Sequence, residues 1–260
     1  MRRIVAEAPR ERDLRFRAEL HDFIRFVARP RFTPRLPRRS AANGRWEDWF
    51  PTVSFRRMLQ WAFFLWVVNL IVLGPIAVFA ATEGGAQHRL DLANVPWLQA
   101  LLWAPVVEEL VFRYGLRHIA QSLWVVPLAV YALLAGPQWV SFFLVVAILL
   151  ICWRPYFGNG WAHRSLPWRF RVRYCHWFPV VFHLSSLAFA AMHLNNFSMH
   201  GTSYWLMPLL VLPQWLTGMV LGWLRVKRGI GASMLLHGIF NGGPLLIVWI
   251  VLHTVPGLVT

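Results

Sequence analysis

The chain has 260 residues, of which 57% are hydrophobic, and its mean hydropathy is +0.47. A soluble domain is less apolar and shows its apolar residues as periodic stripes, so this composition excludes the ordinary globular class. The formal net charge of +15 would suit nucleic acid, but the basic residues flank apolar blocks and no nucleic-acid-binding motif accompanies them. We therefore expect no nucleic-acid partner, and we expect membrane lipid, including anionic head groups, to meet this charge.

The first 57 residues are rich in Arg and Pro and contain no apolar run long enough for a signal peptide. Within this region, residues 10–27 place apolar side chains at helical spacing among charges, which predicts an amphipathic helix on the membrane surface. Residues 29–45 hold three prolines among arginines and favour an extended linker. We expect region 1–57 to be a basic cytoplasmic anchor and topology signal.

Residues 58–260 carry long apolar blocks of the kind that cross a bilayer core, which needs about 20 residues per helix. They predict an all-α, polytopic membrane domain with about seven transmembrane helices, six to eight being compatible with the pattern. In chain order the expected spans are 58–81, a span from about 96, 123–135, 139–153, a span from about 177, 205–224 and 230–253.

The charged segments between these blocks predict an orientation. Basic segments, among them the loop 154–176 with five arginines and no acid, alternate with poorly charged ones at 82–94 and 195–204. The positive-inside rule then places the amino terminus in the cytoplasm. Lys227 is the only lysine, a bias compatible with a GC-rich bacterial genome, so we expect a bacterial inner membrane.

One acidic pair lies inside an apolar span. Nine of the eleven acids precede residue 92, and none follows Glu108 and Glu109. Burying a carboxylate in a membrane costs at least about 2.5–3.5 kcal/mol, so such a pair lines a polar cavity or is compensated. Consecutive helical residues point about 100° apart, and Glu109 lies four residues before Arg113. We expect Glu109 to pair with Arg113, which leaves Glu108 as a candidate general base for water.

Two later spans offer partners for Glu108. Phe189 and His193 share one helix face at i and i+4, and so do His237 and Asn241. With Glu108, these residues could supply a base, proton shuttles and an oxyanion donor, which acyl transfer to water requires. Counted along straight spans, His237 lies nearer the cytoplasmic side than His193, so we expect tilted or broken helices if the two meet.

At these residues the chain resembles a known family. Residues 108–113 fit the EExxxR motif of the CPBP family, also called Abi or CAAX-protease-like intramembrane endopeptidases. Residues 189–193 fit its FxxxH motif and residues 237–241 its HxxxN motif, in the family's order. The resemblance covers residues 96–120 and 177–245, and residues 122–176 stand between as an inserted hairpin and basic loop.

The resemblance implies a peptide hydrolase with helices gathered round a polar intramembrane cavity, acting on a membrane-associated protein or peptide. Carried over by motif position, Glu108 would activate water, His193 and His237 would orient water and stabilise charge, and Asn241 would donate to the oxyanion. The implied supporting residues are Glu109, Arg113 and Phe189.

Two alternatives stay open. Glu108, His193 and His237 could instead ligate a catalytic zinc, but no HExxH motif is present and further supporting acids are lacking, which favours the metal-free form with no cofactor. A non-catalytic scaffold, immunity factor or transporter could use the same polar cluster for binding or proton movement. No internal repeat, typical of transporters, is visible.

Overall fold

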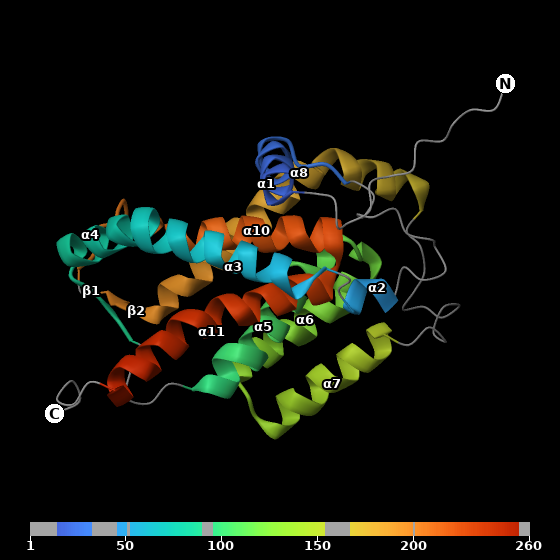
Figure 1. The fold of residues 1–260 in the computed structure, drawn as a ribbon. Coiled ribbons are helices and arrows are strands. Elements are labelled where there is room, and N and C mark those ends of the chain that lie inside the picture. The colour runs from blue at the N-terminus through green and yellow to red at the C-terminus, as the bar shows by residue number, and fades with distance from the viewer. Residues whose placement is uncertain are drawn as a thin grey trace.

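The computed structural model is a bundle of helices with one short two-stranded ribbon (Figure 1). The described residues are 15–32, 46–50, 53–89, 96–153, 167–199 and 201–254. Within them, three helical segments are long and apolar enough to cross a membrane, Phe55–Gly84, Trp168–Asn196 and Ile230–Val251, and two shorter apolar helices accompany them. The predicted all-α polytopic fold is thus confirmed, while the count of seven spans stays a prediction.

The outer surface of the bundle is apolar, as a lipid-facing surface must be. Leu134 is 81% exposed, Trp139 is 78% exposed and Ile71 is 70% exposed. Exposed apolar surface of this extent is typical of a surface that contacts membrane lipid or another protein. In the bilayer core, the backbone polar groups are satisfied inside the helices.

The first span is one helical column with a local irregularity. It comprises α3 (Phe55–Val68), a π-helical turn (Asn69–Leu73) and α4 (Gly74–Gly84). Pro75 has no N–H to donate and its ring would crowd the preceding turn, so the wider turn before it relieves the clash. A Cβ on Gly74 would lie 2.5 Å from the carbonyl oxygen of Asn69, which is why this turn requires glycine.

The acidic pair follows the same construction. A π-helical turn (Gln99–Trp103) precedes α5 (Ala104–Phe112), and the second residue of α5 is Pro105. The backbone N–H of Ala104 donates to Gln99, five residues back, and Pro105 cannot continue this pattern to Ala100. The Ala100 carbonyl is therefore left for a partner from another helix.

The predicted hairpin is present as two apolar helices, α6 (Ile119–Ala135) and α7 (Trp139–Trp153). Gly136, with φ of 73°, ends α6 in a conformation that favours glycine. Helix α7 packs against α6 at the edge of the bundle (Figure 1).

Helix α8 (Trp168–Met192) begins earlier than the sequence suggested. Residues 168–176, which we had assigned to the basic loop, are helical, and the rest of that loop, 154–166, lies outside the described residues. Tyr174 anchors this extension because its hydroxyl donates to the carbonyls of Gly115 and Leu116 at 3.3 and 3.1 Å. The arginines of this segment, which are exposed, led us to predict a loop where the structure has a helix.

The last third contains α9 (Met207–Leu210), α10 (Leu212–Arg228) and α11 (Ile230–Thr254). Helix α10 starts later than the expected span, and the turn to α11 is made at Gly229, whose φ is 115°. Helix α10 packs against both α8 and α11, so it lies between the two helices that carry the histidine motifs.

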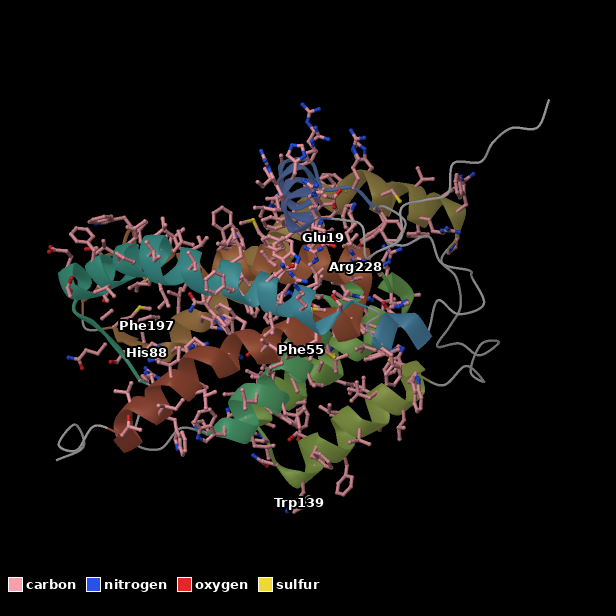
Figure 2. All side chains as sticks on the ribbon, in the orientation of Figure 1. Glu19, Phe55, His88, Trp139, Phe197 and Arg228 are labelled. Atoms are coloured by element: carbon pink, nitrogen blue, oxygen red, sulfur yellow. The ribbon has the colours of Figure 1, made fainter. Side chains whose placement is uncertain are left out.

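A small ribbon was not expected in an all-α chain. Strands β1 (Ala86–His88) and β2 (Phe197–Met199) pair antiparallel with His88 opposite Phe197, and these two rings contact at a centroid distance of 5.0 Å (Figure 2). The ribbon joins the two poorly charged loops that the charge pattern placed on one side. It lies at the end of the molecule away from α2 (Trp46–Trp49) (Figure 1).

The amino-terminal region is built into the bundle rather than separate from it. Helix α1 (Phe16–Ala28) matches the expected amphipathic helix and buries Phe23 and Phe26 in the same core cluster as residues of α3, α8 and α10. Its acid Glu19 is also buried, and accepts hydrogen bonds from Arg228 at 2.5 Å and Trp61 at 3.1 Å. Most of the expected linker 29–45, residues 33–45, lies outside the described residues.

Candidate active site

Helix α5 buries both of its glutamates inside the bundle. Glu109 is completely buried and Glu108 is 8% exposed. Glu109 accepts from Arg113 at 3.0 Å, as the i, i+4 spacing predicted, so this pairing is confirmed. Both side chains of the pair have no solvent exposure, so the ion pair is held in a low-dielectric interior.

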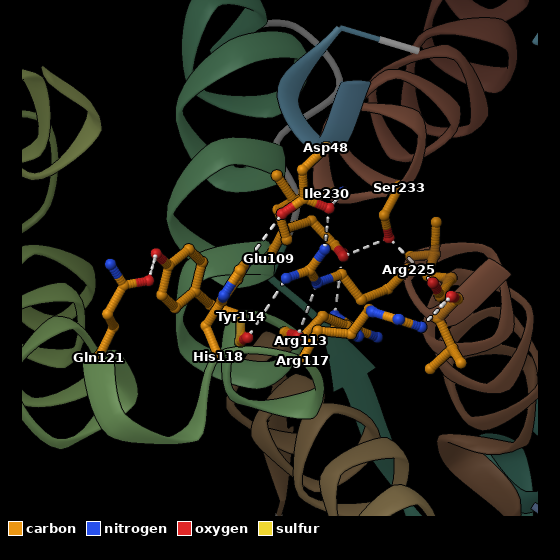
Figure 3. A network of polar contacts seen from close by, with 12 residues as sticks. Asp48, Glu109, Arg113, Tyr114, Arg117, His118, Gln121, Arg225, Ile230 and Ser233 are labelled. Atoms are coloured by element: carbon orange, nitrogen blue, oxygen red, sulfur yellow. Dashed lines mark hydrogen bonds and ion pairs between the residues drawn. The ribbon is translucent and has the colours of Figure 1, made fainter. Parts of the chain in front are cut away.

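Glu109 has two further partners that come from α11. Its Oε2 accepts from the Ser233 hydroxyl at 2.5 Å, and its Oε1 accepts from Nδ1 of His237 at 3.1 Å. Figure 3 shows Arg113 and Ser233 approaching Glu109 from two helices. The carboxylate therefore ties α5 to α11 and is saturated by donors.

This contact sets the orientation of His237. Because the Glu109 carboxylate accepts from Nδ1, Nδ1 carries the proton and Nε2 is left as the second ring nitrogen. Nε2 lies 3.8 Å from Oε2 of Glu108. That carboxylate oxygen is buried and has no hydrogen-bond partner among the described residues. The two atoms are too far apart for a direct hydrogen bond.

Helix α8 brings the aromatic ring of Phe189 into the middle of the cluster. Its centroid lies 4.7 Å from the ring of His193 and 5.7 Å from the ring of His237. The guanidinium of Arg113 lies over the same ring at 3.8 Å. The nitrogen Nδ1 of His193 donates to the Phe189 carbonyl at 2.8 Å, which leaves its Nε2 as the outward nitrogen.

The two histidine motifs meet at Phe189, because its ring contacts the rings of both His193 and His237. Helix α10 begins only at Leu212, later than the expected span, and Gly218 of α10 lies beside Phe189. Counting along the helices still places His193 farther from the turn at Gly229 than His237, so their meeting depends on how the helices cross and on the Phe189 ring between them.

Asn241 has a partner that the sequence did not indicate. Its amide nitrogen donates at 3.0 Å to the carbonyl of Ala100, the group that Pro105 leaves without a helical donor. One amide hydrogen is thereby committed to holding α11 against the π-helical turn, and the second remains for another acceptor. Asn241 lies one turn of α11 beyond His237 and not in direct contact with the carboxylates.

A metal ion would need three ligands in reach of one point. Among the described residues, no three His, Cys, Asp or Glu side chains are grouped in this way, although Glu108 and His237 are neighbours. The expectation that supporting acids are lacking was wrong in one respect. Glu109 accepts from His237, which is the kind of support that a metal-bound histidine also receives.

Two residues of the cluster were missed from the sequence. Ser233 precedes His237 by four positions, so the helical spacing could have placed it on the same face of α11. Gly218 had no such signal. A Cβ there would lie 3.1 Å from the Phe189 ring and 3.3 Å from Nη2 of Arg113, so a larger residue would press on both side chains at this close approach of α10.

Comparison with known proteins identifies the family to which the chain belongs. A family model described as Type II CAAX prenyl endopeptidase Rce1-like matches residues 91–243. The match covers more than half of the chain, contains all three motifs, and runs through residues 122–176 that we had set apart as an insertion. No curated protein and no solved structure matches the chain. The chain therefore belongs to the type II CAAX prenyl endopeptidase Rce1-like family, and the buried glutamate and histidine cluster lies in the matched part.

Proposed function

We propose that Glu108 is the general base that activates water for hydrolysis of a peptide bond within the membrane. Membership of a CAAX endopeptidase family supplies the reaction class, an intramembrane protease. The residues that carry the reaction are our proposal. The substrate we expect is a membrane-associated protein or peptide, because the cluster is buried within an apolar helix bundle.

The observation that carries the proposal is that the Glu108 carboxylate has one oxygen without a hydrogen-bond partner among the described residues. Oε2 is buried, lacks a hydrogen-bond partner in the described structure, and lies 3.8 Å from Nε2 of His237. A water molecule hydrogen-bonds at about 2.7–3.2 Å, so one water beside this pair, off the line joining the two atoms, would contact both. A carboxylate and an imidazole on one water are the groups that general-base catalysis requires.

In the proposed reaction, Glu108 takes a proton from this water as the water oxygen bonds to the substrate carbonyl carbon. The carbonyl oxygen becomes an oxyanion, and the second amide hydrogen of Asn241 is the proposed donor to it. When the C–N bond breaks, Glu108 passes its proton to the leaving nitrogen. His237 and His193 present their Nε2 atoms to the water and the substrate, since Glu109 and the Phe189 carbonyl occupy the Nδ1 atoms.

The test is Glu108→Gln in the full-length protein, assayed for cleavage of a membrane-anchored CAAX peptide. Glu108→Gln keeps the shape and removes the base, so we expect activity to fall by roughly 10²–10⁴-fold while the thermal unfolding midpoint is kept. The matched control is Glu83→Gln, an exposed glutamate at the end of α4, which should retain activity. A Glu108→Gln protein that cleaves at the wild-type rate would instead favour the non-catalytic scaffold.

We also propose that the amino terminus faces the cytoplasm of a bacterial inner membrane. Both cysteines are free thiols, and Cys175 is exposed near the start of α8 while Cys152 is buried. A membrane-impermeant thiol reagent should then label Cys175 in inverted vesicles and not in intact spheroplasts, with Cys175→Ser as the control. Labelling in spheroplasts would reverse the orientation.

A further inference from the structure

A basic cavity lies between the start of α1 and the start of α3. Its volume is about 490 Å³, and it is lined by three arginines, Arg15, Arg56 and Arg57, together with the polar side chains of Ser54 and Gln60. Phe16 forms one wall, and the guanidinium of Arg57 lies 5.7 Å from the centroid of its ring. Three guanidinium groups around one hollow are suited to an anion with several oxygen atoms.

Among the described residues, one acid lines the cavity, and it is already engaged. Glu19 accepts from Arg228 at 2.5 Å and from Trp61 at 3.1 Å, and its distance to Nε of Arg57 is 3.7 Å. No carboxylate of the described residues forms an ion pair with Arg15 or Arg56. The described lining of the cavity therefore carries a net positive charge. Figure 2 labels Glu19 and Arg228 beside each other below the nitrogen-rich side chains of α1.

The cavity also opens on a helix amino terminus. Ser54 caps α3 by accepting from the backbone N–H of Arg57, and the first turn of α3 contains no acid. The helix dipole at this end adds to the attraction for an anion. This end of α3 is where the first candidate membrane span begins, so a membrane placed on that span would have the cavity at its interface with water.

An apolar stripe continues from the cavity along α3. Phe55 is 63% exposed, Leu59 is 40% exposed and Phe63 is 65% exposed, and their i, i+4, i+8 spacing places them on one helix face. A free phosphate would use the arginines alone, whereas a phospholipid would use the arginines and the stripe together. We propose that this cavity binds the phosphate of an anionic phospholipid whose acyl chains lie along Phe55, Leu59 and Phe63. The site is separate from the catalytic cluster and does not depend on the proposed reaction.

The test is native mass spectrometry of the full-length protein in detergent, titrated with phosphatidylglycerol and with phosphatidylcholine. We expect wild type to prefer phosphatidylglycerol, and Arg15→Gln with Arg56→Gln to reduce that preference roughly ten- to thirtyfold, the factor for two basic residues at an anionic surface. The matched control, Arg169→Gln with Arg171→Gln, removes the same charge from the exposed start of α8 and should keep the preference. Leu59→Ser should weaken binding of phosphatidylglycerol by shortening the apolar contact.

Three results would overturn the proposal. An equal loss in the Arg169 and Arg171 control would mean that surface charge in general, and not this cavity, attracts the lipid. Displacement of phosphatidylglycerol by millimolar glycerol 3-phosphate would identify a site for soluble phosphate. An unchanged preference in the Arg15 and Arg56 variant would remove these arginines from lipid binding, since both are exposed and their replacement leaves the fold intact.

Discussion

Two buried polar regions of this molecule use the same chemistry for different ends. Around Glu109, the donors are Arg113, Ser233 and His237, and the neighbouring Glu108 keeps one oxygen without a partner. Around Asp48, the donors are Arg225 at 2.5 Å, the Ile230 backbone N–H at 3.3 Å and His118 at 2.9 Å. The two regions adjoin, because Nε of Arg225 donates to the carbonyl of Arg113 at 3.1 Å (Figure 3).

The two regions differ in whether every carboxylate oxygen has a hydrogen-bond partner. Both oxygens of Asp48 are engaged by groups of the fold, so this carboxylate can only hold α2 against the turn between α10 and α11. A Cβ on Gly229 at that turn would lie 2.6 Å from the Asp48 carbonyl, which shows how closely the two segments pack. Glu108 keeps an oxygen beside an imidazole. A saturated buried carboxylate stabilises structure, whereas an open one is available for chemistry.

The acids of the amino-terminal region stabilise the structure, because they pair with basic residues at the end of α10. Arg225, Lys227 and Arg228 end α10, and they pair with Asp48, Asp22 and Glu19 respectively. Helix α10 therefore reaches the turn before α11 with its charges neutralised by residues outside the matched range 91–243. The region that we expected to act only as an anchor also supports α10, the helix that packs beside the proposed catalytic cluster.

The largest effect should follow from Glu109→Gln, because this residue serves both stability and orientation. Its loss leaves the guanidinium of Arg113 buried without the carboxylate that forms its ion pair, and breaking a buried ion pair costs about 3–5 kcal/mol. We expect a large fall in the thermal unfolding midpoint together with loss of cleavage, measured on the same detergent-purified sample. Full stability in Glu109→Gln would contradict the role given to the ion pair.

The second effect tests the structural region. Asp48→Asn removes the charge that compensates Arg225, although the carbonyls of Arg113 and Tyr114 remain as acceptors for this arginine. We expect a loss of about 2–3 kcal/mol in the free energy of unfolding, as for a hydrogen bond to a charged group, with cleavage per folded molecule little changed. If cleavage falls more steeply than stability, the distinction between the two regions fails.

A smaller effect is expected at Ser233. Ser233→Ala removes one donor from Glu109 and loosens the carboxylate that orients His237, so cleavage should fall by roughly tenfold, the equivalent of about 1.4 kcal/mol. Because Ser233 is a positioning residue, the loss should appear in kcat with KM unchanged, and Ser233→Thr should restore part of it. An unchanged kcat would limit Ser233 to packing.

The smallest effect is expected from metal removal. Activity should persist after exhaustive chelation, because the proposed base is a carboxylate on free water and none of the proposed steps passes through a metal. The measurement is cleavage after chelator titration, with elemental analysis of the purified protein as the control. Loss of activity that zinc restores would replace the general-base role of Glu108 with metal ligation by Glu108, His193 and His237.

Contacts within one helix were predictable because helical geometry alone creates them. The Glu109–Arg113 pair and the contact between the Phe189 and His193 rings both follow from a separation of four residues. Contacts between helices were not predictable in the same way. Glu108 meets His237 across 129 positions, and Asp48 meets Arg225 across 177, and both depend on how the helices cross and on where each helix begins.

Local chemistry and hydropathy by themselves determined that this chain is a helical membrane protein, that one acidic pair is buried, and that Glu109 and Arg113 pair along α5. Only the tertiary structure decided that Glu109 orients His237 and that Ser233 donates to Glu109. It also decided that Asn241 donates to the Ala100 carbonyl, which has no helical donor because of Pro105. The reason is physical. Periodicity specifies the neighbours of a residue on its own helix, but the partner of a buried polar atom on another helix is set by packing of the whole bundle.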